Sequence, residues 1–131
     1  MKTKETYELN GMVKIKVYEN RKETGYTNIM IYNELGEHFV FGVDMCSQCC
    51  EDYELNIDDR YKNFKAPNGI ILVVYFDEDD YGEGGKLVFH VIDKTNKKHN
   101  KMIFSFSNYH NGYYSHEVYL RRNKYIWKKL L

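Results

Sequence analysis

The sequence has little proline, little cysteine and no long apolar run. It contains one proline and three cysteines in 131 residues, and its longest apolar run covers residues 70–76. Such a run is far shorter than the roughly 20 residues that cross a bilayer, and the polar first ten residues argue against a secretory signal. The three cysteines lie within residues 46–50, too close together to cross-link a fold, which favours a reducing, cytoplasmic environment.

The composition indicates a globular domain rather than a disordered chain. Hydrophobic residues make up 43% of the sequence and aromatic residues 16%, with 13 tyrosines. A chain of this length can bury a core of its own. We therefore predict one domain over residues 1–131, with the basic, aromatic residues 121–131 as its C-terminal tail or last strand.

Charge is balanced overall but unevenly distributed. Residues 44–93 carry four basic and twelve acidic side chains, a net charge of −8, whereas residues 94–131 carry nine basic and one acidic, a net charge of +8. Two interpretations are open. Either adjacent strands bring the two segments together and neutralise them, or the basic segment forms a separate face for an anionic partner.

The first 43 residues show the alternation of a half-buried antiparallel sheet. Valine and isoleucine alternate with lysine over residues 12–18, and the Asn10-Gly11 pair just before them is a common hairpin turn. We expect residues 6–9 to pair with residues 12–18. Residues 26–32 and 38–43 are predicted to form two more strands.

The later residues predict further strands and one short helix. Residues 57–64 carry apolar side chains at helical spacing, with two aspartates near the start, where the helix dipole favours acids. The apolar residues 70–76 predict a central strand. Further strands are predicted at residues 86–93, 101–107 and 113–120, the last entered through Asn111-Gly112.

These elements predict an α+β, β-dominated fold. We expect an antiparallel meander sheet of about seven to nine strands, as a partly closed barrel or a sandwich, with one short helix near residues 57–64. The last strands are expected to meet at a tight turn around Asn111 and Gly112.

The cysteine cluster is the first candidate for chemistry. Cys46 and Cys49 have the spacing of a zinc-ligand pair, which His99 or His110 could complete. The sequence lacks a second cysteine pair, and the acidic residues that follow the cluster disfavour a thiolate. Structural cysteines, a zinc site and a thiol-dependent enzyme built on residues 46–51 all stay open, and no cofactor is expected.

Other candidates favour structural roles. The acidic, glycine-bearing residues 77–85 lack the ligand spacing of an EF-hand, so we predict a solvated loop. His116 falls on the apolar face of its strand, where we expect a core residue. No catalytic motif stands out, and we predict that the chain is not an enzyme.

The C-terminal residues form the strongest candidate binding surface. Cations interleaved with aromatic rings can grip phosphates and stack on bases, and they would also grip an acidic protein surface. The alternative, in which the rings are core and the lysines are solvated, stays open. The predicted binding residues are Tyr113, Ser115, Glu117, Arg121, Arg122, Lys124 and Trp127.

Short motifs add a family resemblance. They are Cys-Cys-Glu at residues 49–51, Pro67 and Gly69 ahead of an apolar strand, and Asn-Gly-Tyr-Tyr-Ser at residues 111–115 followed by Val118. Over about residues 28–120 the chain resembles an uncharacterised domain-of-unknown-function family found in bacteriophages and phage-like regions of bacterial genomes. That family tends to carry His and Asp just before the cysteine pair, where this chain has Met45 and Gln48.

The resemblance implies a phage accessory context and no particular reaction. We therefore predict a small non-enzymatic phage or mobile-element protein that inhibits or sequesters a component of a host defence system by binding it. The predicted partner is a host defence protein, its nucleotide signal or a nucleic acid, in the bacterial host cytoplasm, with homo-oligomerisation left open. The alternatives are a zinc- or thiol-dependent enzyme using residues 46–51 and a nucleic-acid-binding protein using the basic residues 121–131.

Overall fold

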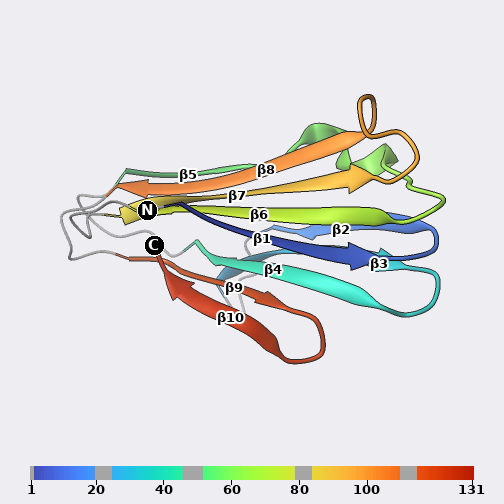
Figure 1. Ribbon diagram of the computed structural model, residues 1–131. Coiled ribbons are helices and arrows are strands. Elements are labelled where there is room, and N and C mark those ends of the chain that lie inside the picture. The colour runs from blue at the N-terminus through green and yellow to red at the C-terminus, as the bar shows by residue number, and fades with distance from the viewer. Residues whose placement is uncertain (1, 20–24, 46–51, 79–83, 110–114) are drawn as a thin grey trace.

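The computed structural model describes residues 2–19, 25–45, 52–78, 84–109 and 115–131. Within these ranges the chain forms ten strands and one short 3-10 helix. The strands make two antiparallel five-stranded sheets that face each other as two layers (Figure 1). The prediction of a β-dominated antiparallel fold is confirmed, and the architecture is the sandwich rather than the barrel. The described residues form ten strands instead of the expected seven to nine, and the strand order of each sheet is not that of a meander.

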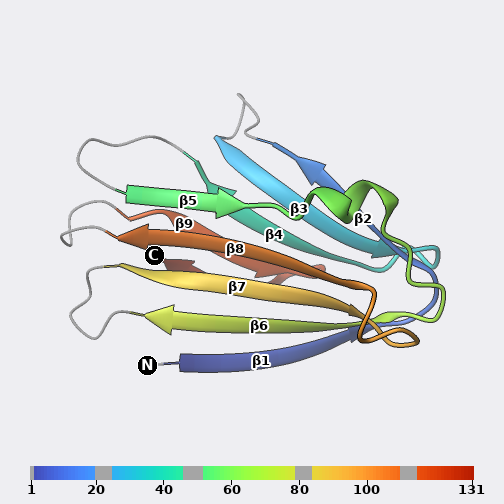
Figure 2. The same cartoon turned by 90° about the horizontal axis from the view of Figure 1, so that it is seen from above.

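Each sheet combines strands from distant parts of the sequence. Sheet A has the order β1-β6-β7-β8-β5 and sheet B the order β10-β9-β4-β3-β2 (Figure 2). The strands of sheet A are β1 (Lys2–Leu9), β6 (Ile70–Glu78), β7 (Gly84–Asp93), β8 (Lys101–Tyr109) and β5 (Asp52–Asn56). Those of sheet B are β10 (Tyr125–Leu130), β9 (Glu117–Arg121), β4 (His38–Asp44), β3 (Tyr26–Asn33) and β2 (Val13–Tyr18). The helix η1 (Asp59–Asn63) lies beside β2.

The hydrophobic core lies between the two sheets. Alternate side chains of each strand point inward, as the period of two requires. Phe41 of β4 stacks on Phe89 of β7 with 3.8 Å between ring centroids, and Phe89 stacks on Phe104 of β8 at 4.7 Å. Burying each such ring contributes about 1.5–3 kcal/mol. The central strand predicted at residues 70–76 is confirmed as β6, between β1 and β7.

The hairpin expected at Asn10-Gly11 is wrong. Strand β1 pairs with β6 and strand β2 pairs with β3, so the strands on either side of this turn belong to different sheets. Gly11 does adopt the left-handed conformation of a turn, with φ of 76°. The turn carries the chain across the sandwich, because the apolar faces of β1 and β2 reach the core from opposite sides.

The other local predictions fared differently. Strands β3 and β4 pair across a short connection, as expected for residues 26–32 and 38–43. Asn111 and Gly112 lie outside the described residues, so the tight turn expected there stays a prediction. The strands on either side of it, β8 and β9, belong to different sheets and do not pair with each other. The helix predicted at residues 57–64 is found as the shorter 3-10 segment η1.

One carboxylate connects the two sheets where β1 faces β10. Glu5 Oε2 accepts a hydrogen bond from the Tyr7 hydroxyl at 2.7 Å and another from Trp127 Nε1 at 3.0 Å. Burial, followed by the bond to the nearby Glu5 carboxylate, raises the pKa of Tyr7 from 10.0 to about 12. The neutral phenol is therefore the form that the folded protein favours.

This raised pKa predicts a loss of stability in alkali. Between pH 10 and 12 the unfolded Tyr7 loses its proton while the folded one keeps it, so the free energy of unfolding falls as pH rises through that window. Denaturant unfolding of the wild type and of Tyr7→Phe across the window checks this. We expect a shallower fall in the variant, and parallel curves would contradict the prediction.

Candidate functional site

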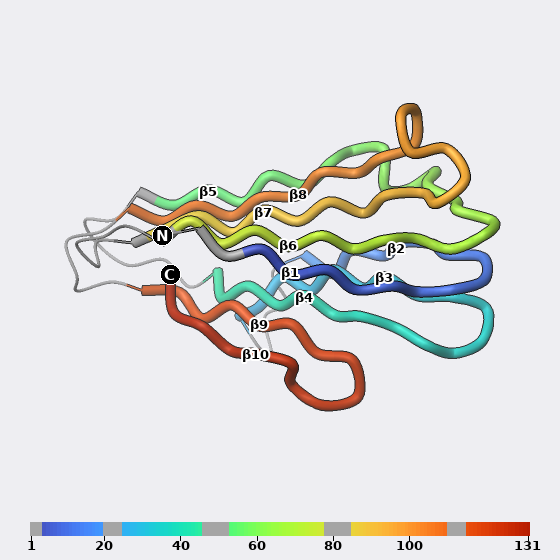
Figure 3. Tube along the Cα trace, viewed as in Figure 1, coloured from blue at the N-terminus to red at the C-terminus, as the bar shows by residue number. Residues whose placement is uncertain are grey.

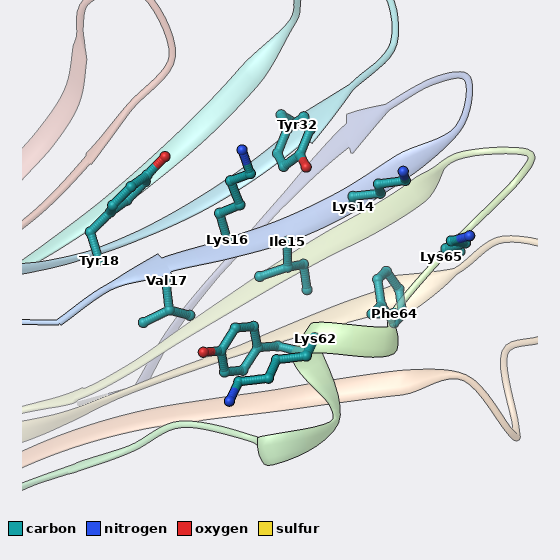
Figure 4. Close-up of a pocket in the computed structure, with 10 residues that line it drawn as sticks. Lys14, Ile15, Lys16, Val17, Tyr18, Tyr32, Lys62, Phe64 and Lys65 are labelled. Atoms are coloured by element: carbon teal, nitrogen blue, oxygen red, sulfur yellow. The ribbon is translucent and has the colours of Figure 1, made fainter.

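A groove lies between the edge strand β2 and the helix η1 (Figure 4). Its volume is about 360 Å³, within the range of small-molecule sites. It extends from the free edge of β2 onto the outward face of sheet B. The described residues that line it are Lys14, Ile15, Lys16, Val17, Tyr18, Tyr32, Tyr61, Lys62, Phe64 and Lys65, and we call this the lysine–tyrosine groove.

The alternation of β2 divides the groove into an apolar and a polar part. Ile15 and Val17 point toward the core and form its floor, whereas Lys14 and Lys16 point outward. Val13 bonds both of its backbone groups to Ala66, at 2.9 and 3.0 Å. This bridge fixes the segment after η1 against the beginning of β2 and closes one end of the groove.

The opposite wall is held in place by Asp58, the N-cap of η1. Its carboxylate accepts from Arg60 Nη2 at 2.7 Å and from the backbone N–H of Ile103 at 3.4 Å. Arg60 in turn donates to the carbonyl oxygen of Lys101. The bond from the Arg60 guanidinium holds the pKa of the Asp58 carboxyl below its ordinary value. These contacts attach η1 to β8 of sheet A, while Tyr61 of η1 and Phe64 just after it line the groove beside β2.

The chemistry of the lining is cationic and aromatic. Four lysines and three tyrosines contribute to it, and none of its described residues carries a carboxylate. The Lys16 ammonium lies 5.6 Å from the centroid of the Tyr32 ring, and Lys62 lies 5.9 Å from that of Tyr61. Clustered ammonium groups beside aromatic faces favour a ligand that combines negative charge with planar groups.

Three of the predicted binding residues lie on or next to the outward side of β9. Ser115 precedes β9 and is exposed, and Arg121 is exposed on the strand itself. Glu117 accepts a hydrogen bond from the Tyr26 hydroxyl at 3.0 Å. Burial and this bond raise the pKa of Tyr26. Tyr113 lies outside the described residues.

The remaining predicted binding residues lie on the hairpin that β9 and β10 form, but their side chains have different surroundings (Figure 3). Lys124 is exposed in its turn. Arg122 pairs with Glu37 at 2.6 Å and lies over the Phe39 ring. Trp127 points between the sheets, where it packs against Phe76. The predicted set is therefore not gathered into one site.

Two ion pairs of the basic residues 94–131 fit neither interpretation of the uneven charge distribution. Arg122 pairs with Glu37, and Lys94 pairs with Glu8 at 3.2 Å. Both acidic partners come from the first 43 residues, not from the acidic middle of the chain. The basic C-terminal strands β9 and β10 join sheet B at the edge opposite β2, which carries Lys14 and Lys16.

Several sequence candidates fall outside the described residues or have structural roles. Cys46, Cys49 and His110 lie outside them, so the zinc and thiol hypotheses stay predictions. Within the described ranges, no group of three or more potential metal ligands is found. His116 is fully buried, its ring against Tyr53 at 4.5 Å between centroids, and its expected place in the core is confirmed.

Sequence reasoning missed the lysine–tyrosine groove. The alternation around Lys14 and Lys16 predicts only the solvent-exposed side of a strand, and Lys62 and Lys65 lie far away in the sequence. Only the packing of η1 beside β2 brings the two pairs together. The signal in the sequence was the alternation of lysine with apolar residues over residues 13–17, followed by Tyr18, with Tyr32 on the next predicted strand.

The fold and the groove define a two-sheet β-sandwich with a basic, aromatic hollow at one edge. Comparison of the chain with protein-family models, with curated proteins and with solved structures finds no match. No helix in the described ranges has the length and hydropathy that crossing a bilayer requires.

Proposed function

We propose that this chain is a non-enzymatic binding protein that takes an anionic partner in the lysine–tyrosine groove. The observation that carries the proposal is the gathering of four lysine side chains from two distant segments along one groove. Its apolar floor and aromatic walls supply contact area, and the lysines supply attraction and orientation.

The arrangement suits binding better than chemistry. Lysine ammonium groups are donors and point charges, whereas acid–base catalysis needs a group whose proton affinity matches the reaction. The groove's cations are carried on exposed, flexible stems around a strand edge. Such a site recognises negative charge through a field that weakens with salt.

A charge-reversal pair tests the groove. Lys14→Glu/Lys16→Glu should weaken the binding of inorganic polyphosphate at least about tenfold and flatten its salt dependence, because two cations that face the partner are replaced by repelling anions. Isothermal titration over a series of salt concentrations measures both quantities.

The matched control is Lys97→Glu/Lys98→Glu, an equal charge change at two exposed lysines in the connection between β7 and β8. This control should bind polyphosphate almost as the wild type does. Equal losses in both double variants, or no binding by the wild type, would show that the groove is not an anion site.

We further propose that the bound partner belongs to a host defence system. The support for this role is the resemblance to phage and prophage proteins at residues 49–51 and 111–115. The same two double variants test it. Phage plating on a defence-bearing host should rise with the wild type and the control but not with Lys14→Glu/Lys16→Glu, and unchanged plating with the wild type would contradict the role.

A further inference from the structure

The outward face of sheet B extends the groove across all five strands. Two complete rows of residues cross this face, as the strand registers show. The first row, from β2 to β10, is Tyr18, Asn28, Gly42, Tyr119 and Lys128. The second row is Lys16, Met30, Val40, Arg121 and Tyr125. None of these ten residues is acidic, whereas the next row on the same face carries Asp44 and Glu117. The face spans four strand spacings, roughly 19 Å.

Tyr119 lies flat on this face. A Cβ atom placed on Gly42 would be 2.1 Å from the Tyr119 ring, so the ring rests directly on the backbone of β4. Its hydroxyl donates to Asn28 Oδ1 at 2.6 Å, which holds the ring across two neighbouring strands. One face of the ring is thus against the sheet and the other is turned outward.

Further rings and cations surround Tyr119. The Tyr125 ring stands edge-on to it, with 5.4 Å between centroids and 89° between planes, and the Lys128 ammonium lies 4.1 Å from the Tyr125 ring centroid. The Tyr26 ring lies 5.7 Å from the Tyr119 ring, centroid to centroid, and is tilted by 53° against it. In these two rows the rings and cations therefore gather at the β9–β10 end of the face, and Lys16 and Tyr18 lie at its β2 end.

We infer that the anionic partner is a single-stranded nucleic acid that crosses the outward face of sheet B from the lysine–tyrosine groove to the β9–β10 hairpin. This inference rests on the proposed function. A nucleic acid strand carries phosphates and planar bases at regular intervals, and the face offers cations beside rings at both of its ends. An acidic protein surface would use the cations but would have no need of a ring laid flat against the sheet.

Tyrosine variants distinguish the two kinds of partner. The probe is a fluorescein-labelled oligothymidylate of about 15 nucleotides, a length at the upper end of single-domain site sizes. Tyr125→Ala should weaken its binding about tenfold or more, because each stacked base contributes about that factor. Tyr18 lies at the β2 end of the first row, at the opposite edge of the sheet from Tyr125. Tyr18→Ala should therefore also weaken binding if the nucleic acid spans the whole face.

Tyr109→Ala is the matched control. Tyr109 and Tyr125 are each 55% exposed, but Tyr109 belongs to β8 of sheet A. The control should leave the affinity unchanged, and thermal unfolding of each variant confirms that it is folded.

The outcomes separate this inference from the proposed function. If oligothymidylate fails to bind, or binds without regard to Tyr125, while polyphosphate still requires Lys14 and Lys16, the nucleic-acid inference falls and the anion site stands. Tighter binding of polyglutamate than of oligothymidylate would identify an acidic protein as the partner and would also overturn the inference. If the wild type does not bind polyphosphate at all, the proposed function itself is wrong, whatever the result with oligothymidylate.

Discussion

Trp127→Ala should destabilise the fold by about 3–4 kcal/mol. The indole lies between the sheets, 4.7 Å from the Phe76 ring centroid and 6.2 Å from that of Phe41. Its N–H also donates to Glu5, so the alanine variant loses both the packed ring and the bond that connects β10 to β1. Because this substitution removes the only tryptophan of the chain, the variant has no tryptophan fluorescence, and unfolding is best followed by circular dichroism.

Trp127→Phe separates the two contributions. Phenylalanine keeps most of the ring contacts and loses the donor to Glu5, for which we expect a cost of about 1.5 kcal/mol. Urea unfolding of both variants gives the comparison. A cost below about 1 kcal/mol for the alanine variant would show that Trp127 does not hold the sheets together.

Gly42→Ala is expected to cost about 2 kcal/mol. The new methyl group would overlap the Tyr119 ring, which would have to leave its place and give up the bond to Asn28. Glycine is otherwise unfavourable inside a strand, so without the ring the same substitution should be neutral or stabilising.

A double-mutant cycle tests this explanation. In a Tyr119→Ala background, Gly42→Ala should cost little, and the two substitutions should show strong coupling in denaturant unfolding. Additive costs would mean that the ring does not require the glycine. The cycle leaves the core untouched, because both residues face outward from sheet B.

Local patterns predicted the strands well but not their partners. The period of two at residues 12–18 correctly gave a strand with one buried face. Asn10-Gly11 correctly gave a turn, yet the partner of β1 is β6, more than fifty residues further along the chain. Pairing depends on which apolar faces close one core, and that choice is made by contacts distant in the sequence.

The candidate site shows the same limit. The cation–aromatic character of residues 121–131 was visible in the sequence, and Arg121, Tyr125 and Lys128 do lie on the proposed face. Their companions on β2 and β3 could not be assigned to it, because no local pattern indicates that β9 pairs with β4. Trp127 was placed with the binding residues because aromatic side chains in a strand look alike until the two faces are known.

Mapping of backbone amide chemical shifts on addition of oligothymidylate tests the central claim most directly. The account predicts that the perturbed amides concentrate on β2, β3, β9 and β10 and around Lys62 and Lys65, with sheet A unchanged. Perturbations centred on the outward face of sheet A, or none at saturating oligonucleotide, would contradict it.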